Sequence, residues 1–313
     1  MDKTLLTALI ALVVVLNNSI QGQITYTGGT YTQNFDTLAS TGTNNPWTNN
    51  VTLPGWYLFR QPSPGTPLNT YNASDGSNNA GSFYSFGSVG SNERALGAIG
   101  SGGAYWGNPG SGATAGWMAV AFTINTPAAV NSFTISYTGE QWRDANTNAQ
   151  DLQLEWGVGA TFGGVATWTA PGGTFNFTSP QTSGTAGALD GNLAANRVTN
   201  LGGTVNTTLN IGGTLWIRWR VLNAPGNDHG LAIDDFSFST TLIPEPQHYA
   251  IFLAVLLALV ILIRRRAKSD APQNPTARPD QSLSLTGTTK VSKVLLSTAT
   301  SGGGFLFTSL LFR

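Results

Sequence analysis

The sequence predicts an all-β protein, a two-sheet antiparallel β-sandwich of jelly-roll type, followed by one short C-terminal transmembrane helix. Two observations predict the sandwich. Apolar residues alternate with polar ones in several segments between residues 23 and 242, as in strands that have one buried face. Turn-forming glycine is abundant, with 38 residues in the chain, and it separates these segments. A third observation, the uninterrupted apolar run from Ala250 to Ile263, predicts the helix.

The composition excludes several kinds of chemistry. The chain of 313 residues contains no cysteine, so it has no disulfides, thiolate metal sites or cysteine nucleophiles. Only 10% of the residues are charged, which is typical of a loop-rich extracellular β protein rather than a cytosolic enzyme.

Residues 1–22 have the order of a secretory signal peptide. Lys3 precedes an apolar segment from Leu5 to Leu16, and polar residues follow before Gln23. The apolar segment is short for a membrane span of ~20 residues, so a cleaved signal peptide is favoured over a retained anchor. The sandwich is then expected to occupy residues 23–242.

The strand predictions depend on period-two alternation. The alternating apolar sets are Met118, Val120, Phe122 and Ile124; Phe133, Ile135 and Tyr137; Leu152, Leu154, Trp156 and Val158; and Leu215, Ile217, Trp219 and Val221. Further strands are expected near Trp56, Phe83, Leu96 and Phe175. The resulting set of about ten strands is enough for two sheets. Segments 44–50 and 69–116 are rich in Gly, Asn and Ser and are predicted to be long surface loops.

The last predicted strand changes phase. Leu231 and Ile233 share one face, but the apolar residues resume at Phe236 and Phe238, a slip of one position across Asp234-Asp235. Such a slip indicates a β-bulge, in which two residues oppose one on the neighbouring strand.

The charges are segregated along the chain. Between Gln23 and Ile243, six arginines and no lysines stand against eleven acidic residues, a net charge of −5. Between Arg264 and Arg313, eight basic residues stand against two acidic ones, a net charge of +6. An acidic ectodomain argues against nucleic acid as a partner. A basic segment after a membrane helix belongs on the cytoplasmic side.

The segment between the sandwich and the helix reads Ile243-Pro244-Glu245-Pro246. Its prolines donate no backbone hydrogen bond and bias their neighbours to extended conformations, so an exposed extended peptide is expected. The fourteen residues of 250–263 cover only ~21 Å as a helix. Because Arg264, Arg265 and Arg266 can snorkel, this helix can cross a thin or locally thinned bilayer, with the sandwich outside and the arginines inside.

This order of a Pro-Glu-Pro peptide, a short apolar helix and an arginine cluster resembles the PEP-CTERM sorting signal of Gram-negative bacteria that make an extracellular polymeric matrix. The resemblance covers residues 243–266. It implies that an exosortase, an integral-membrane cysteine peptidase, recognises Pro244, Glu245 and Pro246 and removes or replaces the helix during export. It also implies an intermediate anchored in the inner membrane.

Such signals end a few residues after the arginines, whereas 47 residues follow Arg266 here. Residues 267–313 are predicted to be a cytoplasmic or disordered tail, or an altered reading frame past the usual stop.

Four segments of the ectodomain, 34–38, 53–56, 137–143 and 233–236, look like parts of the jelly-roll modules found in many PEP-CTERM proteins. This resemblance implies a fold and assigns no chemistry.

The chain has two histidines, His229 and His248. His248 lies beside the apolar run, and His229 lies in a turn rich in Gly, Asn and Asp. No Gly-x-Ser-x-Gly nucleophile motif is present, so a loop role for His229 is favoured over a serine triad.

Glu140 and Glu155 are the candidate catalytic carboxylates. Trp142 lies two residues after Glu140 and Trp156 directly follows Glu155, and retaining glycosidases use two carboxylates ~5 Å apart. The pair requires the strands around Tyr137 and Leu154 to be neighbours. The favoured alternative is an ion pair for Glu140 and a solvated position for Glu155.

Asp228, Asp234 and Asp235 are candidate ligands of Ca²⁺, which prefers oxygen donors. Their spacing fits no EF-hand loop. A turn-capping aspartate plus a bulge is the simpler interpretation, so no cofactor is assigned.

Four tryptophans, Trp47, Trp106, Trp117 and Trp216, are candidate glycan contacts, because exposed aromatic rings stack on sugar rings. The alternative is that they anchor the core or the loops.

The sequence therefore predicts an exported surface or extracellular-matrix protein with a structural or adhesive role and no catalysis. Its expected partners are an exosortase-like membrane peptidase and the inner membrane, with extracellular polysaccharide as a candidate and nucleic acid excluded. The alternatives are a carbohydrate-binding module that uses loop aromatics and a glycoside hydrolase that uses Glu140 and Glu155.

Overall fold

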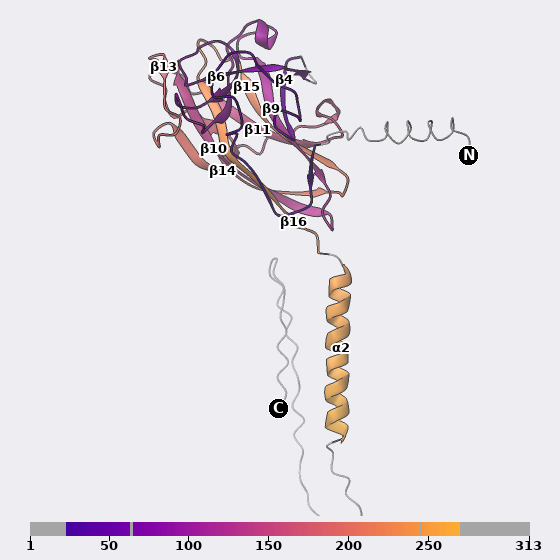
Figure 1. The fold of residues 1–313 in the computed structure, drawn as a ribbon. Helices are drawn as coiled ribbons and strands as arrows, with labels where there is room; N and C mark the ends of the chain where they lie inside the picture. The colour runs from indigo at the N-terminus through magenta and orange to yellow at the C-terminus, as the bar shows by residue number, and fades with distance from the viewer. Residues whose placement is uncertain (1–22, 63–64, 245, 270–313) are drawn as a thin grey trace, which may run out of the picture. The chain divides into compact units, whose positions relative to one another are not determined.

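A computed structural model describes residues 23–62, 65–244 and 246–269 of the chain (Figure 1). The chain divides into two units, Met1–Ile251 and Phe252–Arg313. The predicted signal peptide, Glu245 and residues 270–313 lie outside the described residues.

The first unit contains two β-sheets. The first is seven-stranded. Its order is β12 (Phe177–Thr178), β11 (Asp151–Val158), β15 (Thr214–Leu222), β9 (Thr114–Ile124), β4 (Trp56–Arg60) and β5 (Thr66–Pro67), with β1 (Ile24–Tyr26) paired in parallel with β9.

The second sheet is nine-stranded. Its order is β13 (Gly187–Ala188), β10 (Val130–Asp144), β16 (Gly230–Leu242), β8 (Ala95–Ile99), β7 (Ser82–Phe86), β6 (Thr70–Ser74) and β3 (Asn45–Pro46), with β14 (Arg197–Leu209) paired with β10 and β2 (Thr30–Gln33) with β16. Three 3₁₀ helices, η1 (Ala104–Trp106), η2 (Phe162–Gly164) and η3 (Gly173–Phe175), lie in the connections.

These two sheets form a β-sandwich, as predicted. Aromatic rings from opposite sheets meet in its core: Phe122 of β9 stacks on Phe238 of β16 with ring centroids 4.1 Å apart. Trp56 of β4 and Phe236 of β16, both fully buried, meet edge to face with ring centroids 5.5 Å apart. The finer jelly-roll assignment stays a prediction.

The longest predicted strands are confirmed, because all four alternating sets lie in β9, β10, β11 and β15. The strands expected near Phe83 and Leu96 are also confirmed, as β7 and β8. The prediction that 69–116 is surface loop is wrong as a whole. Every residue of β7 and β8 is buried, so both faces of these strands are covered and no alternation marks them.

The predicted bulge is confirmed. Ser136 of β10 lies opposite Ser237 of β16, but Thr138 lies opposite Asp234, so two residues of β16 oppose Tyr137. Asp235 has a positive φ of 49°, which aspartate tolerates better than most residues. The bulge separates the neighbouring aspartates: Asp234 is buried and Asp235 is exposed.

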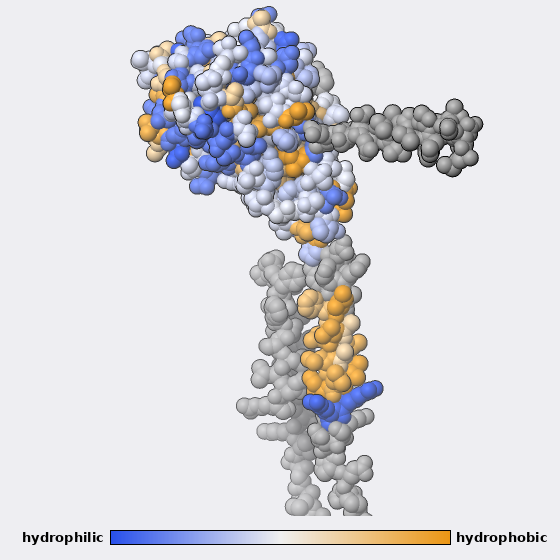
Figure 2. Space-filling view, viewed as in Figure 1, coloured by the Kyte–Doolittle hydropathy of each residue, from blue (hydrophilic) through white to orange (hydrophobic). Residues whose placement is uncertain are grey.

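The helix α2 runs from Pro246 to Ser269, which is longer than the predicted 250–263. Its side chains from Ile251 to Ile263 are apolar and exposed, and the three arginines follow them, as the orange and blue surfaces show (Figure 2). Within the described residues, no helix combines the length and the hydropathy that a membrane crossing requires.

Candidate functional site

The outer face of the seven-stranded sheet carries a second cluster of aromatic side chains. While Met118 and Val120 of β9 face the core, the intervening Ala119 contacts this outer cluster. Small side chains such as Ala119 and Ala121 leave room for the segment containing η2 to fold over the sheet. The outer aromatic cluster consists of Tyr57, Phe59, Trp117, Phe162, Trp168 and Trp216.

Arg218 of β15 lies within the outer aromatic cluster. Its guanidinium carbon is 3.7 Å from the ring centroid of Trp168 and 4.9 Å from that of Trp117, so it makes cation–π contacts. Its Nε lies 2.6 Å from Oε2 of Glu155. Burial lowers the pKa of Arg218, and the Glu155 carboxylate opposes that shift. The ion pair therefore keeps a charged group beneath the aromatic rings.

A cleft of about 280 Å³ opens at the edge of this cluster. Its lining includes Tyr57, Phe59, Phe162, Trp216, Gln23 and Thr161. The rings of Phe59 and Phe162 stack at 4.1 Å, and the half-buried Tyr57 ring lies 4.8 Å from Trp216. We name it the aromatic cleft.

The Tyr57 hydroxyl makes no hydrogen bond to any part of the chain that the structure describes. Burial raises the pKa of Tyr57 to about 12, so the hydroxyl keeps its proton at neutral pH. Phe59 and Phe162 are buried like Trp216, so the accessible part of the aromatic cleft is the half-buried Tyr57 ring with its free O–H. A ring of this kind is suited to a ligand with hydroxyl groups and an apolar face, such as a sugar.

The four tryptophans predicted to contact glycan are all buried. The expectation that their rings are exposed for stacking on sugars is therefore wrong. Their exposed fractions are 2% for Trp47, 0% for Trp106, 4% for Trp117 and 2% for Trp216. The indole of Trp47 donates to Asn49 and that of Trp106 to the Ile99 carbonyl, which fixes both in the fold. Phe162 covers Trp117 and Trp216, and only Trp216 reaches the wall of the aromatic cleft.

The predicted glycosidase pair does not form. Glu140 lies on β10 and Glu155 on β11, and these strands belong to different sheets. Glu155 pairs with Arg218 on one outer face, whereas Glu140 accepts a hydrogen bond from Trp142 on the other. Because packed sheets are ~10 Å apart, the two carboxylates are separated by far more than the ~5 Å of a retaining pair.

The predicted set of calcium ligands is also wrong, because Asp228, Asp234 and Asp235 do not come together. Asp235 is exposed beside Thr32, Gln33 and Asn34, and Asp228 lines a different cavity.

Asp234 instead meets Glu140 and Glu93, and one carboxylate oxygen of each lies within 4.8 Å of the others. We name these three residues the acidic cluster. Burial raises the pKa of Glu140 to about 7, although the Trp142 hydrogen bond lowers it, and burial raises the pKa of Asp234 to about 9. Sequence reasoning missed Glu93, because it lies in a loop with no pattern that points to the other two residues.

Asp228 and Arg143 line a separate cavity of about 100 Å³. Asp228 Oδ1 accepts a hydrogen bond of 2.8 Å from the Ala224 N–H, but its Oδ2 is buried without a partner. Burial raises the pKa of Asp228 to about 6.

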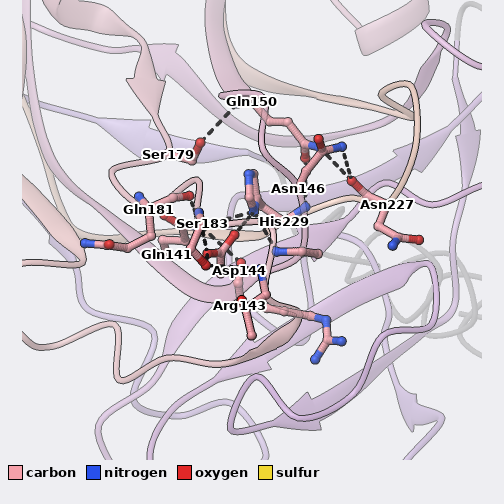
Figure 3. A network of polar contacts seen from close by, with 12 residues as sticks. Gln141, Arg143, Asp144, Asn146, Gln150, Ser179, Gln181, Ser183, Asn227 and His229 are labelled. Atoms are coloured by element: carbon pink, nitrogen blue, oxygen red, sulfur yellow. Dashed lines mark hydrogen bonds and ion pairs between the residues drawn. The ribbon is translucent and has the colours of Figure 1, made fainter.

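His229 lies in a network of polar side chains that joins the end of β10 to the connections before β11, after β12 and before β16 (Figure 3). The N–H of Ala145 donates to His229 Nδ1 at 3.1 Å, so Nδ1 carries no proton, and Nε2–H donates to the Asn148 carbonyl at 3.1 Å. Asp144 Oδ1 is 3.4 Å from Nδ1, but no proton lies between them.

The neighbouring hydroxyl, that of Ser183, donates to Asp144 and not to His229. This arrangement holds the loops together and lacks the geometry of a serine triad, in agreement with the loop role predicted for His229. His248 lies in the first turns of α2, and its side chain is outside the described residues.

The proposed sorting residues lie around the start of α2 and in its second half. Pro244 is exposed, and Pro246 is the first residue of the helix rather than part of an extended peptide. Proline is favoured at the first helical position, because its missing N–H would have no partner there. Arg264, Arg265 and Arg266 are exposed within α2.

Comparisons with known proteins assign no family. No family model matches the chain, and no curated protein matches it. A solved structure that matches is the CBM22-1 xylan-binding domain of Xyn10C from Paenibacillus barcinonensis, with 11% sequence identity, 70% of this chain and 98% of that chain covered, and a TM-score of 0.32. No conclusion about fold family or ligand follows from a likeness of this size.

Proposed function

We propose that this chain is an exported surface or matrix protein, tethered through its C-terminal segment, whose sandwich binds polysaccharide in the aromatic cleft without hydrolysing it. The observation that carries the binding role is the free Tyr57 hydroxyl beside the stacked rings of Phe59 and Phe162. A second cavity of about 230 Å³, beside His229, contains no Phe, Tyr or Trp and is less suited to a sugar ring.

The non-catalytic part of the proposal is supported by the placement of the carboxylates. Glu140 and Glu155 lie on different sheets, so they do not form an acid–nucleophile pair. In the acidic cluster, Glu140 is 1% and Asp234 is 5% exposed, which leaves no access for a glycosidic bond.

Binding is tested by probing a polysaccharide array with the full chain and with a Tyr57→Ala variant. We expect binding to at least one acidic or neutral polysaccharide, and a loss of about tenfold in affinity for the variant, equal to ~1.4 kcal/mol. Phe175→Ala is the matched control, because it removes a half-buried ring that does not line the aromatic cleft. No binding to any polysaccharide, or equal binding by Tyr57→Ala, contradicts the proposal.

The tethering role is supported by the order of the sequence and by the charge segregation. Export through an exosortase-like system would begin with the signal peptide at 1–22 and would involve Pro244, Glu245 and Pro246, with the apolar residues 251–263 of α2 in the inner membrane. A chain that stops after Ile243 tests this role. We expect the shortened protein to leave the membrane fraction, and equal membrane retention of both chains would contradict tethering.

A further inference from the structure

The acidic cluster is assembled by three adjacent parts of the nine-stranded sheet. Glu140 of β10 lies opposite Ala232 of β16, so Glu140 and Asp234 are diagonal neighbours on one face. Glu93 precedes β8, which pairs with the other edge of β16. These carboxylates belong to the outer face of the sheet, where Trp142 packs with Tyr84 and Phe86.

Two oxygens of the acidic cluster have no partner. Only 5% of the surface of Asp234 is exposed, and its Oδ1 makes no hydrogen bond. Glu93 Oε1 is buried and has no partner either, whereas the Oε2 of the same residue accepts from the Asn192 amide. A buried carboxylate oxygen without a partner is unfavourable, so something must satisfy these two atoms.

The part of the chain that the structure describes supplies no close counter-charge to the acidic cluster. Among the described residues, no arginine or histidine nitrogen lies within 4.0 Å of a carboxylate oxygen of Glu93, Glu140 or Asp234. Arg197, which lies opposite Glu140 on β14, lowers the pKa of Glu140 through its charge but forms no ion pair with it.

We propose that the acidic cluster binds one Ca²⁺ ion, with a carboxylate oxygen each from Glu93, Glu140 and Asp234. Ca²⁺ binds oxygen ligands at ~2.4 Å, so three evenly spaced oxygens on one ion are about 4.2 Å apart. The three oxygens of the acidic cluster lie within 4.8 Å of one another, so small side-chain shifts bring them to this distance. Mg²⁺, with bonds of ~2.1 Å and near-octahedral geometry, would require the carboxylates to be closer.

The ion would join strands β10 and β16 to the loop before β8. The aromatic cleft lies on the other sheet, so the calcium proposal does not depend on the polysaccharide proposal. An experiment that contradicts one of them leaves the other unaffected.

The test uses terbium luminescence with the full chain. Tb³⁺ is a probe for Ca²⁺ sites, and an indole close to the ion sensitises its emission. The Trp142 Nε1 lies 2.9 Å from Glu140 Oε2, so excitation of tryptophan should produce terbium emission that excess Ca²⁺ abolishes. We expect Glu140→Gln and Asp234→Asn each to lower the affinity by more than about tenfold, since even indirect disturbance of a metal ligand costs roughly 10–100-fold.

Glu155→Gln is the control, because it removes a carboxylate on the opposite sheet, and it should bind the ion as the wild type does. A second measurement does not depend on the folding of any variant: Ca²⁺ should raise the Tm of the wild-type protein after treatment with a chelator, and Mg²⁺ should raise it less. The proposal is overturned if wild-type protein shows no Ca²⁺-dependent change in Tm or emission, or if Asp234→Asn keeps the full response.

Discussion

Asp228→Asn should make the protein less sensitive to pH. Asp228 is 3% exposed, and burial raises its pKa from the ordinary value of 3.8 to about 6. The folded state therefore binds the proton more tightly than the unfolded state does. Between pH 3.8 and 6 the wild-type protein loses stability as the pH rises, because the unfolded chain ionises first.

The magnitude follows from the two pKa values. A shift of about two units corresponds to about 3 kcal/mol of unfolding free energy over the whole range, and to about 2 kcal/mol between pH 4.5 and pH 7.5. Asparagine has no such titration, and its Oδ1 can keep the hydrogen bond from Ala224. Any constant cost of the amide cancels when the two pH values are compared.

The assay is urea denaturation of both proteins at pH 4.5 and pH 7.5. We expect the variant to gain about 2 kcal/mol relative to the wild type on going to the higher pH. His229, the next residue, and Arg143, which lines the same cavity, are unchanged in the variant. A difference between the proteins that does not vary with pH would refute the assignment of a buried, destabilised carboxylate.

Three further substitutions test the packing. Arg218→Ala should lower the free energy of unfolding, measured with urea, by about 3 kcal/mol, because it removes the cation–π contacts and leaves Glu155 unpaired. In the double variant with Glu155→Gln, the loss of unfolding free energy should be smaller than the sum of the losses in the two single variants. Trp56→Ala should cost about 3–5 kcal/mol, since it empties a fully buried site between the sheets, and a loss below 1 kcal/mol would argue against this core. Gly76→Ala should prevent folding or cost several kcal/mol, because its Cβ would lie 1.8 Å from a backbone oxygen, whereas Gly90→Ala, also at positive φ but in open space, should cost only about 1–2 kcal/mol.

Local patterns in the sequence were sufficient for the long strands and for the bulge. The set from Met118 to Ile124 alternates because one face of β9 meets the large core rings, while the other carries alanines under the η2 segment. The phase slip at Asp234-Asp235 coincides with the register shift between β10 and β16, where the bulge adds one residue to β16. In contrast, β7 and β8 are covered on both faces, so their sequences show no period.

The sites were harder to predict, because they depend on contacts between distant segments. Trp117 and Trp216 lie on an outer face, as their alternation indicates, but Phe162 covers them from a connection that has no signal of its own. Glu140 and Asp234 were singled out separately, and only the pairing of β10 with β16 brings them together. The assignment of strands to sheets decides that Glu140 and Glu155 are apart, and the alternation of each strand holds no information on that assignment.

We propose that the C-terminal tether is temporary, because an exosortase-like peptidase would remove it when the chain reaches the cell surface, and intact-mass analysis of the surface-exposed protein tests this most directly. We expect a chain that lacks the signal peptide and ends near Pro244-Glu245-Pro246, with the arginine cluster and residues 267–313 removed. A surface protein whose mass includes every residue through Arg313 would contradict it.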